Sequence, residues 1–173
     1  MTEQNLIKPQ WLKIKLAVND EFSNIKNTLK SHNLHTVCEE AHCPNISECW
    51  NTGTATFMLM GDVCTRGCKF CAVKTGNPMK KLDFDEPKKL AQALAEIKLF
   101  DYVVLTSVNR DDLEDNGSSH FAECIMEIKK AYPEIIVEVL IPDFKGNDDD
   151  LKKIVDAKPE VIAHNIETVE SLQ

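Results

Sequence analysis

The chain has 173 residues, 43% of them hydrophobic, and a formal net charge of −8. This length supports a single core, and the lack of a long apolar run excludes a membrane-spanning helix and predicts a soluble globular protein. The acidic balance disfavours nonspecific nucleic-acid binding, which depends on phosphate neutralisation by clustered lysine and arginine.

The first residues, MTEQNLIKPQ, are polar and lack the apolar core of a secretion signal, so we expect a cytoplasmic protein; the alternative is an organelle matrix reached without a visible transit peptide. A short amphipathic helix is predicted next, because Phe22, Ile25 and Leu29 recur at helical spacing. We divide the chain into an N-terminal extension, residues 1–54, and an α/β unit, residues 55–173.

Six of the seven cysteines fall into two groups of three. They are Cys38, Cys43 and Cys49 in VCEEAHCPNISECW, and Cys64, Cys68 and Cys71 in GDVCTRGCKFCAV. The second group follows a predicted buried strand, TATFMLMGD, and therefore lies at a strand's carboxyl end, where parallel α/β folds bind ligands. A cubic iron-sulfur cluster has four irons, so three cysteines leave one iron open to an exchangeable ligand. The spacing predicts two metal sites of this kind.

Strand and helix patterns alternate over the rest of the chain. Helical spacing is found in KKLAQALAEIKLF, NGSSHFAECIMEIKKAY and NDDDLKKIVDA, and strand patterns in YVVLTSV, EIIVEVLIP and EVIAHNI. Ser118 or Ser119 is the predicted N-cap of the second of these helices. Such repeats build a parallel sheet with right-handed crossovers.

The second cysteine spacing, with Phe70 before its last member, resembles the signature of the radical S-adenosylmethionine (SAM) enzymes. More widely, the segments TVCEEAHCPNISECW, TATFMLMGDVCTRGCKFCAV, LTSVNRDDL, HFAE, VEVLIPDFKG and HNIETV occur in an order that resembles the lipoyl synthase family. This resemblance implies a partial TIM barrel instead of a doubly wound sheet. We therefore expect the N-terminal part of a radical SAM barrel of parallel βα repeats, preceded by a cysteine-rich extension.

The resemblance also implies an activity. In radical SAM enzymes the open iron is chelated by SAM, and electron transfer from the cluster yields the 5′-deoxyadenosyl radical. The members of this 4Fe-4S site are Cys64, Cys68 and Cys71. In lipoyl synthases an auxiliary 4Fe-4S cluster, here on Cys38, Cys43 and Cys49, is consumed as it gives sulfur to an octanoyl chain on a carrier protein's lysine. The expected protein is thus a sulfurtransferase with SAM and two 4Fe-4S clusters as cofactors.

The partners that the resemblance implies are an octanoylated lipoyl carrier domain or H-protein and an electron donor such as ferredoxin or flavodoxin. It also implies residues that contact SAM: Phe70 against the adenine, Thr106 and Ser107 at the methionine end, and Asn165 at the ribose. Glu138 alternates with valines, so it is expected to point into the barrel as a ligand partner; a carboxylate on a wet strand face is the alternative.

The chain has two arginines, Arg66 and Arg110, among twenty basic residues, and both lie in candidate site loops. Because guanidinium offers a planar fork for carboxylate or phosphate, we expect these two residues to bind substrate. Two positions depart from the family pattern, with Asn109 in place of an aspartate and Asn116 in place of a glycine. No catalytic carboxylate is therefore expected at position 109.

Other uses of the cysteines are less well supported. Disulfides require an oxidising compartment and fit poorly with an odd cysteine count. Zinc suits thiolates, but structural zinc usually takes two paired motifs that close a tetrahedron. Ferredoxin clusters follow a pattern ending in cysteine-proline that neither group shows. Cys124 shares helical spacing with apolar residues and is expected to be a small buried hydrophobe.

The chain ends within HNIETVESLQ, where another helical pattern begins. Members of the lipoyl synthase family continue further, so the resemblance implies a fragment that lacks the C-terminal part. The alternative function for such a chain is a catalytically silent fragment that binds iron-sulfur clusters or zinc.

Overall fold

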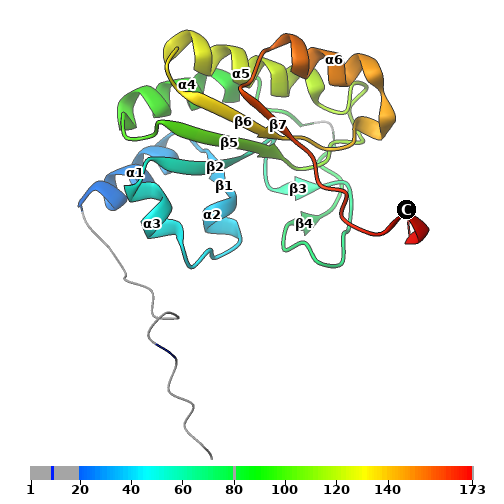
Figure 1. Ribbon diagram of the computed structural model, residues 1–173, viewed down its shortest axis with the longest axis horizontal. Helices are drawn as coiled ribbons and strands as arrows, with labels where there is room; N and C mark the ends of the chain where they lie inside the picture. The colour runs from blue at the N-terminus through cyan, green and yellow to red at the C-terminus, as the bar shows by residue number, and fades with distance from the viewer. Residues whose placement is uncertain (1–8, 10–19, 80, 173) are drawn as a thin grey trace, which may run out of the picture.

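The computed structural model describes residues 9, 20–79 and 81–172; the rest of the predicted extension lies outside the described residues. The main sheet has the strand order β1-β2-β5-β6-β7 (Figure 1). Its strands are β1 (His35–Thr36), β2 (Thr54–Leu59), β5 (Tyr102–Ser107), β6 (Ile136–Leu140) and β7 (Val161–Ala163). The pairs β2/β5, β5/β6 and β6/β7 are parallel, which confirms the predicted parallel βα arrangement.

Three helices cover one face of this sheet and the cysteine-bearing segments project from the other (Figure 1). The covering helices are α4 (Glu86–Ile97), α5 (Ser118–Ala131) and α6 (Asp148–Asp156). The remaining described elements are α1 (Asp20–Ser31), α2 (Val37–Glu40), α3 (Ile46–Asn51), the short strands β3 (Val63–Cys64) and β4 (Lys74–Thr75), and the 3-10 turns η2 (Phe144–Gly146) and η3 (Glu170–Leu172). None of the described helices is long and apolar enough to cross a membrane.

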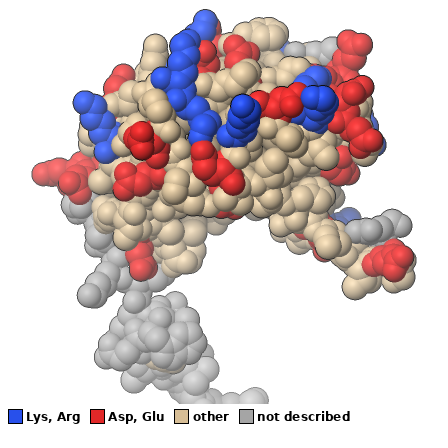
Figure 2. Space-filling view, turned by 45° about the horizontal axis from the view of Figure 1, so that its top comes forward, with Lys and Arg blue, Asp and Glu red and all other residues tan. Residues whose placement is uncertain are grey.

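The core lies between the sheet and the covering helices. On β2, Ala55, Phe57 and Leu59 are buried at alternate positions, because successive strand side chains point to opposite faces. Phe57 meets Phe100 edge to face, with ring centroids 6.3 Å apart. Each fully buried side chain of this size contributes roughly 1.5–3 kcal/mol through the area removed from water. The outer surface of the helix layer carries charges of both signs side by side (Figure 2).

The N-terminal segment packs against the same core. The predicted helix is α1, and its buried residues Ile25 and Leu29 confirm the expected apolar face. Phe22 stacks at a tilt against Trp50 of α3, with centroids 5.0 Å apart. β1, which the sequence did not predict, pairs antiparallel with β2. The division of the chain at residue 54 stays a prediction. β2 begins at this residue, and it is hydrogen-bonded to β1 from the segment before it.

The start of α5 corrects one sequence expectation. Its N-cap is Gly117, at a φ of 83°, and neither serine caps it. Asp115 instead accepts hydrogen bonds from the N–H groups of Ser119 at 3.0 Å and Gly117 at 3.1 Å. Burial acts to raise the pKa of Asp115, but these hydrogen bonds and the Ser119 side chain outweigh it and lower the pKa to about 2. The Ser118 hydroxyl donates to Asp150 of α6 at 2.8 Å.

Asn116 ties the loop before α5 to α6. Its backbone has a φ of 52°, a left-handed conformation that Gly and Asn adopt most readily. Its side chain is nearly buried, and Nδ2 donates to Asp150 at 3.0 Å and lies 3.5 Å from the carbonyl of Phe144. An asparagine at this position therefore adds a contact that a glycine lacks.

Asn116→Asp is expected to destabilise the chain by roughly 2–3 kcal/mol, because it places a second carboxylate against the buried Asp150. Urea unfolding at neutral pH measures this effect. Asn116→Gly is the control and should cost about 1 kcal/mol at most, since it removes the hydrogen bond but relaxes the left-handed backbone. Equal stability of the two variants would contradict this account of the contact.

Candidate metal centre

The second cysteine group lies on a loop that a small sheet closes at its base. β3 pairs in parallel with β4, and the N–H of Gly76 donates to the carbonyl of Cys64 at 2.9 Å. Between them, Cys68 and Cys71 are exposed, and the N–H of Cys71 donates to the carbonyl of Cys68 at 3.1 Å. The three thiols therefore lie on one closed loop beyond the carboxyl end of β2.

The sulfur of Cys64 is surrounded by hydrogen-bond donors. It accepts from the N–H of Arg66 at 3.4 Å and from the N–H of Asn109 at 3.3 Å. Donors of this kind orient a cysteine sulfur that binds metal. One donor comes from the cysteine loop itself and the other from the loop after β5, so two strand ends converge on this atom.

Arg66 fastens the cysteine loop to the ends of two other strands. Its Nε and Nη2 donate to Asp111, after β5, at 2.9 and 2.8 Å. Its Nη1 and Nη2 donate to Asp143, after β6, at 2.7 and 2.8 Å. The neighbouring Thr65 hydroxyl donates to Asp111 at 2.7 Å, and its N–H donates to the carbonyl of Asn109 at 3.0 Å.

Arg66, Thr65, Asp111 and Asp143 together form a clamp, and its hydrogen bonds shift the pKa values of its charged groups. Hydrogen bonds from Arg66 hold the pKa of Asp111 well below the ordinary value of 3.8 and lower that of Asp143. The two carboxylates in turn raise the pKa of Arg66. With its amide turned so that oxygen faces the guanidinium, Asn109 also accepts from Arg66, at 2.9 and 3.2 Å. A neutral side chain at 109 thus avoids a third negative charge.

Arg110 has a different environment, because its side chain is fully buried. Its Nε and Nη2 donate to the two oxygens of Asp112 at 2.8 and 3.0 Å, and its Nη1 lies 3.4 Å from the carbonyl of Met60. Both guanidinium forks of the chain are therefore occupied by its own carboxylates. The predicted contact of Arg66 and Arg110 with substrate stays a prediction.

The first cysteine group is carried by two short helices and the turn between them. Cys38 lies in α2 and Cys49 in α3, and all three thiols are half-buried. The N–H of Cys43 donates to the carbonyl of Cys38 at 3.0 Å. Burial, followed by the neighbouring thiols of Cys38 and Cys43, raises the pKa of Cys49. The thiols of Cys38 and Cys43 therefore lie close enough to act on that of Cys49.

The predicted SAM contacts differ in place and exposure: Glu138 is in the middle of β6, and Phe70 is on the cysteine loop. Thr106 and Ser107 end β5, and the Ser107 Oγ is buried with no hydrogen-bond partner within the described part of the chain. Glu138 accepts a hydrogen bond from the Tyr102 hydroxyl, which raises the pKa of Tyr102. Asn165 is exposed beyond β7, and Phe70 is 69% exposed on the cysteine loop.

The donor sets fit iron-sulfur clusters and a cofactor beside one of them. Among the described residues, neither cysteine trio brings its sulfurs within 4.8 Å of one another, as ligands of a single ion would lie. A cube of four irons holds its cysteines further apart. The unpartnered Ser107 Oγ also supplies a hydrogen-bonding group at the strand end where a polar cofactor would bind.

Sequence reasoning missed the residues that hold the cysteine loop in place. Thr65, Asp111 and Asp143 form the clamp with Arg66, and Glu86 and His120 form a buried pair between α4 and α5. The only signal in the sequence was the presence of arginine in a lysine-rich chain. It marked the centre of the clamp but not its partners.

Comparison with protein families identifies the class of protein that this fold and site define. Residues 58–172 match the radical SAM superfamily, and residues 2–43 match the N-terminal domain of lipoyl synthase. The chain belongs to the radical SAM superfamily. Membership implies SAM and a 4Fe-4S cluster as cofactors.

The particular resemblance is to lipoyl synthase, as the sequence motifs indicated. The chain is 61% identical over 170 residues to a lipoyl synthase of Halorubrum lacusprofundi, covering 96% of this chain and 54% of that protein. It is 56% identical over 167 residues to one of Caldicellulosiruptor bescii, covering 96% of this chain and 57% of that protein. A relative from Culex quinquefasciatus, named lipoyl synthase, mitochondrial, is 56% identical over 176 residues, covering 98% of this chain and 46% of that protein. The chain spans about half the length of the curated relatives it matches.

Proposed function

We propose that this chain carries the two cluster sites of a lipoyl synthase, a sulfurtransferase of the radical SAM class. The net reaction replaces two C–H bonds of a protein-bound octanoyl chain by C–S bonds, with SAM and a reductant as co-substrates and 5′-deoxyadenosine and methionine as products. The observation that carries the proposal is the pair of separate cysteine trios on the same side of the sheet, opposite the covering helices (Figure 1).

Cys64, Cys68 and Cys71 would hold the cluster that binds SAM, and Cys38, Cys43 and Cys49 the auxiliary cluster. When bound, the first supplies the one-electron chemistry that activates C–H bonds and the second supplies sulfur. The protein's contribution is then positional. The clamp of Arg66 to Asp111 and Asp143 fixes the first trio against the ends of β5 and β6.

The strand ends would bind SAM. Ser107, with its unpartnered hydroxyl, and Thr106 would bind the methionine end, and Asn165 the ribose. Glu138, held by Tyr102, would act from β6 as a further ligand partner. Phe70 is exposed on the cysteine loop, and its ring would cover the adenine. Arg66 and Arg110 would act on substrate indirectly, through the loops that they hold.

The proposed substrate is an octanoylated lipoyl carrier domain or H-protein, and the proposed electron donor is a ferredoxin or flavodoxin. We place the protein in the cytoplasm, where a reducing environment keeps thiols free. In support, all seven cysteines are unpaired with one another. Since one relative is named mitochondrial, fractionation of the native host should decide between the cytoplasm and an organelle matrix.

Anaerobic reconstitution with iron and sulfide tests the proposal. About eight irons per chain are expected for two cubes, with reductant and SAM yielding 5′-deoxyadenosine. An octanoylated carrier should gain two sulfurs by mass spectrometry, as the dithiol that forms under reducing conditions, and should lose two hydrogens only when that dithiol is afterwards oxidised to the disulfide. Iron loading with no cleavage of SAM would favour the silent cluster-binding fragment, and zinc occupancy with no iron would exclude both cluster sites.

A further inference from the structure

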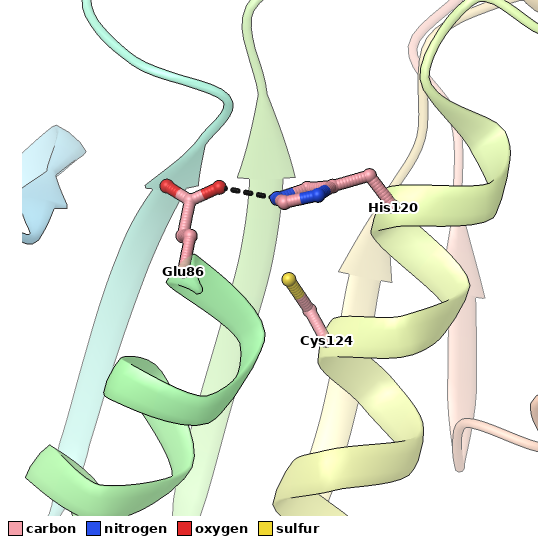
Figure 3. A group of neighbouring side chains, drawn as sticks. All are labelled: Glu86, His120 and Cys124. Atoms are coloured by element: carbon pink, nitrogen blue, oxygen red, sulfur yellow. Dashed lines mark hydrogen bonds and ion pairs between the residues drawn. The ribbon is translucent and has the colours of Figure 1, made fainter. Parts of the chain in front are cut away.

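A buried group of three side chains lies between the start of α4 and the first turns of α5. Glu86, His120 and Cys124 place their oxygen, nitrogen and sulfur atoms within 4.8 Å of one another (Figure 3). Their exposed fractions are 6%, 5% and 0%, so each is removed from water. The imidazole of His120 and the carboxylate of Glu86 point at each other, with Nε2 and Oε2 2.6 Å apart.

The carboxylate of Glu86 also holds the backbone at the end of β2. The N–H of Met60 donates to its two oxygens at 2.9 and 3.2 Å. Met60 and Gly61 both have left-handed backbones, with φ values of 67° and 93°, and form the turn that leads from β2 into the cysteine loop. The N–H at such a turn has left the strand ladder and must find another acceptor when buried. Glu86 supplies it.

The other groups of Met60 are held as well. Arg110 reaches its carbonyl at 3.4 Å while its fork is fixed by Asp112. The sulfur of Met60 packs so closely on Gly117 that a Cβ added to this glycine would lie 2.4 Å from it. The amide, the carbonyl and the side chain of this one residue are thus fixed by three separate segments of the chain. Four residues later the chain reaches Cys64.

The geometry of the group favours a hydrogen-bonded support over a metal site. An oxygen and a nitrogen that bind the same tetrahedral zinc lie about 3.3 Å apart, given bonds of about 2.0–2.1 Å. The contact between His120 and Glu86 is 2.6 Å, the length of a charge-assisted hydrogen bond. The carboxylate is already engaged by Met60, and burial raises the pKa of the Cys124 thiol, which keeps it neutral.

We propose that Glu86 and His120 are positioning residues that fix the Met60–Gly61 turn and thereby set the position of Cys64 relative to the strand ends. His120 holds the carboxylate, the carboxylate holds the Met60 amide, and the turn directs the loop. This inference rests on the proposed function, in which Cys64 holds the cluster that binds SAM. Cys124 packs beside the pair but makes no part of this chain of contacts.

The first test uses the protein before cluster loading. In Glu86→Gln one of the two oxygens that accept from the Met60 N–H becomes an NH₂ donor whichever way the amide turns, and the negative charge is lost, because both carboxylate oxygens lie within 3.2 Å of that nitrogen. Hydrogen exchange in a peptide spanning residues 58–71 should accelerate about tenfold, as expected for one lost charge-assisted hydrogen bond. Exchange in β6 should not change. Cys124→Ala, which removes a buried neighbour without touching Met60, should leave the 58–71 peptide unchanged.

The second test uses the reconstituted protein and the electron paramagnetic resonance spectrum of its reduced cluster. The SAM concentration that gives half of the spectral change should rise about tenfold in Glu86→Gln and in His120→Leu, the scale of losses around metal ligands. His120→Gln keeps a donor toward Glu86 and should restore most of the affinity. Cys124→Ala should stay within about twofold of the parent.

The outcomes separate the two levels of inference. If the parent shows no spectral change with SAM, the proposed function fails, and hydrogen exchange still decides the positioning role. If the parent responds and Glu86→Gln matches it in both measurements, the positioning role is wrong. Unchanged hydrogen exchange in β6 is the check that each variant is folded. Stoichiometric zinc binding by the parent that both Glu86→Gln and Cys124→Ala abolish would also overturn the proposal in favour of a metal site.

Discussion

Cys68→Ala is expected to remove about half of the iron and essentially all SAM cleavage. With one thiolate of the second trio gone, a cube on this loop loses an anchor, so iron should fall from about eight to about four per chain. Formation of 5′-deoxyadenosine should drop by more than about 100-fold, the upper end of what losses outside the ligand shell cost. Cys68 is exposed on the loop, so its replacement should leave the core intact. Iron analysis and chromatography of the nucleoside measure both effects.

Two cysteine variants serve as controls. Cys49→Ala should also lose about four irons but retain SAM cleavage, because the trio on α2 and α3 is separate from the loop after β2. Sulfur transfer to the octanoyl chain should then be lost. Cys124→Ala removes a thiol of the same chemistry from a buried helical position and should keep all the iron. Full iron loading in Cys68→Ala would contradict the assignment of the loop.

Much of the fold could be predicted because local patterns and burial agree. The segment TATFMLMGD reads as a buried strand, and β2 occupies Thr54–Leu59 with its apolar residues buried. Pro87, at the start of α4, fits the preference of proline for the first helical turn. Cys124 is fully buried, as its helical spacing predicted. Each of these inferences depends on neighbours within a few residues.

The parts that escaped prediction depend on contacts between distant residues. Arg66 meets Asp143 across 77 positions in the sequence, and Glu86 meets His120 across 34. β1 has two residues, too few for an alternating pattern, and forms because β2 offers it an edge. The cap of α5 is supplied by Asp115 because Ser118 is used by α6 instead. Propensity alone cannot decide between such competing partners.

The pH dependence of the clamp follows from its lowered carboxylate pKa values. A carboxylate whose pKa is lower in the folded than in the unfolded chain adds stability above the unfolded pKa, and that stability is lost as the pH falls through the folded pKa. Arg66 lowers the pKa of both Asp111 and Asp143 from the ordinary 3.8. The contribution of the clamp should therefore be complete at neutral pH and decline below about pH 3.8.

Arg66→Gln is expected to destabilise the unloaded chain by roughly 2 kcal/mol at pH 7, because it removes the cation between Asp111 and Asp143 and leaves Asp111 with Lys145, at 3.5 Å. The estimate is below that for a fully buried pair, since the side chains of Arg66 and Asp143 are 32% and 48% exposed. At pH 3 the difference from the parent should be smaller, because the aspartates of the variant, which lack the cation, are then largely protonated and no longer repel each other. Urea unfolding at both pH values measures this change.

Arg66→Lys separates charge from geometry at the same position. An ammonium keeps the positive charge but cannot span Asp111 and Asp143 with paired hydrogen bonds, as the guanidinium does at 2.7–2.9 Å. It should recover part of the stability at pH 7 while leaving the cysteine loop less well held, so that iron loading at Cys64, Cys68 and Cys71 stays below that of the parent. A loss of under about 0.5 kcal/mol in Arg66→Gln, unchanged between pH 7 and pH 3, would show that the loop is held in place by other contacts.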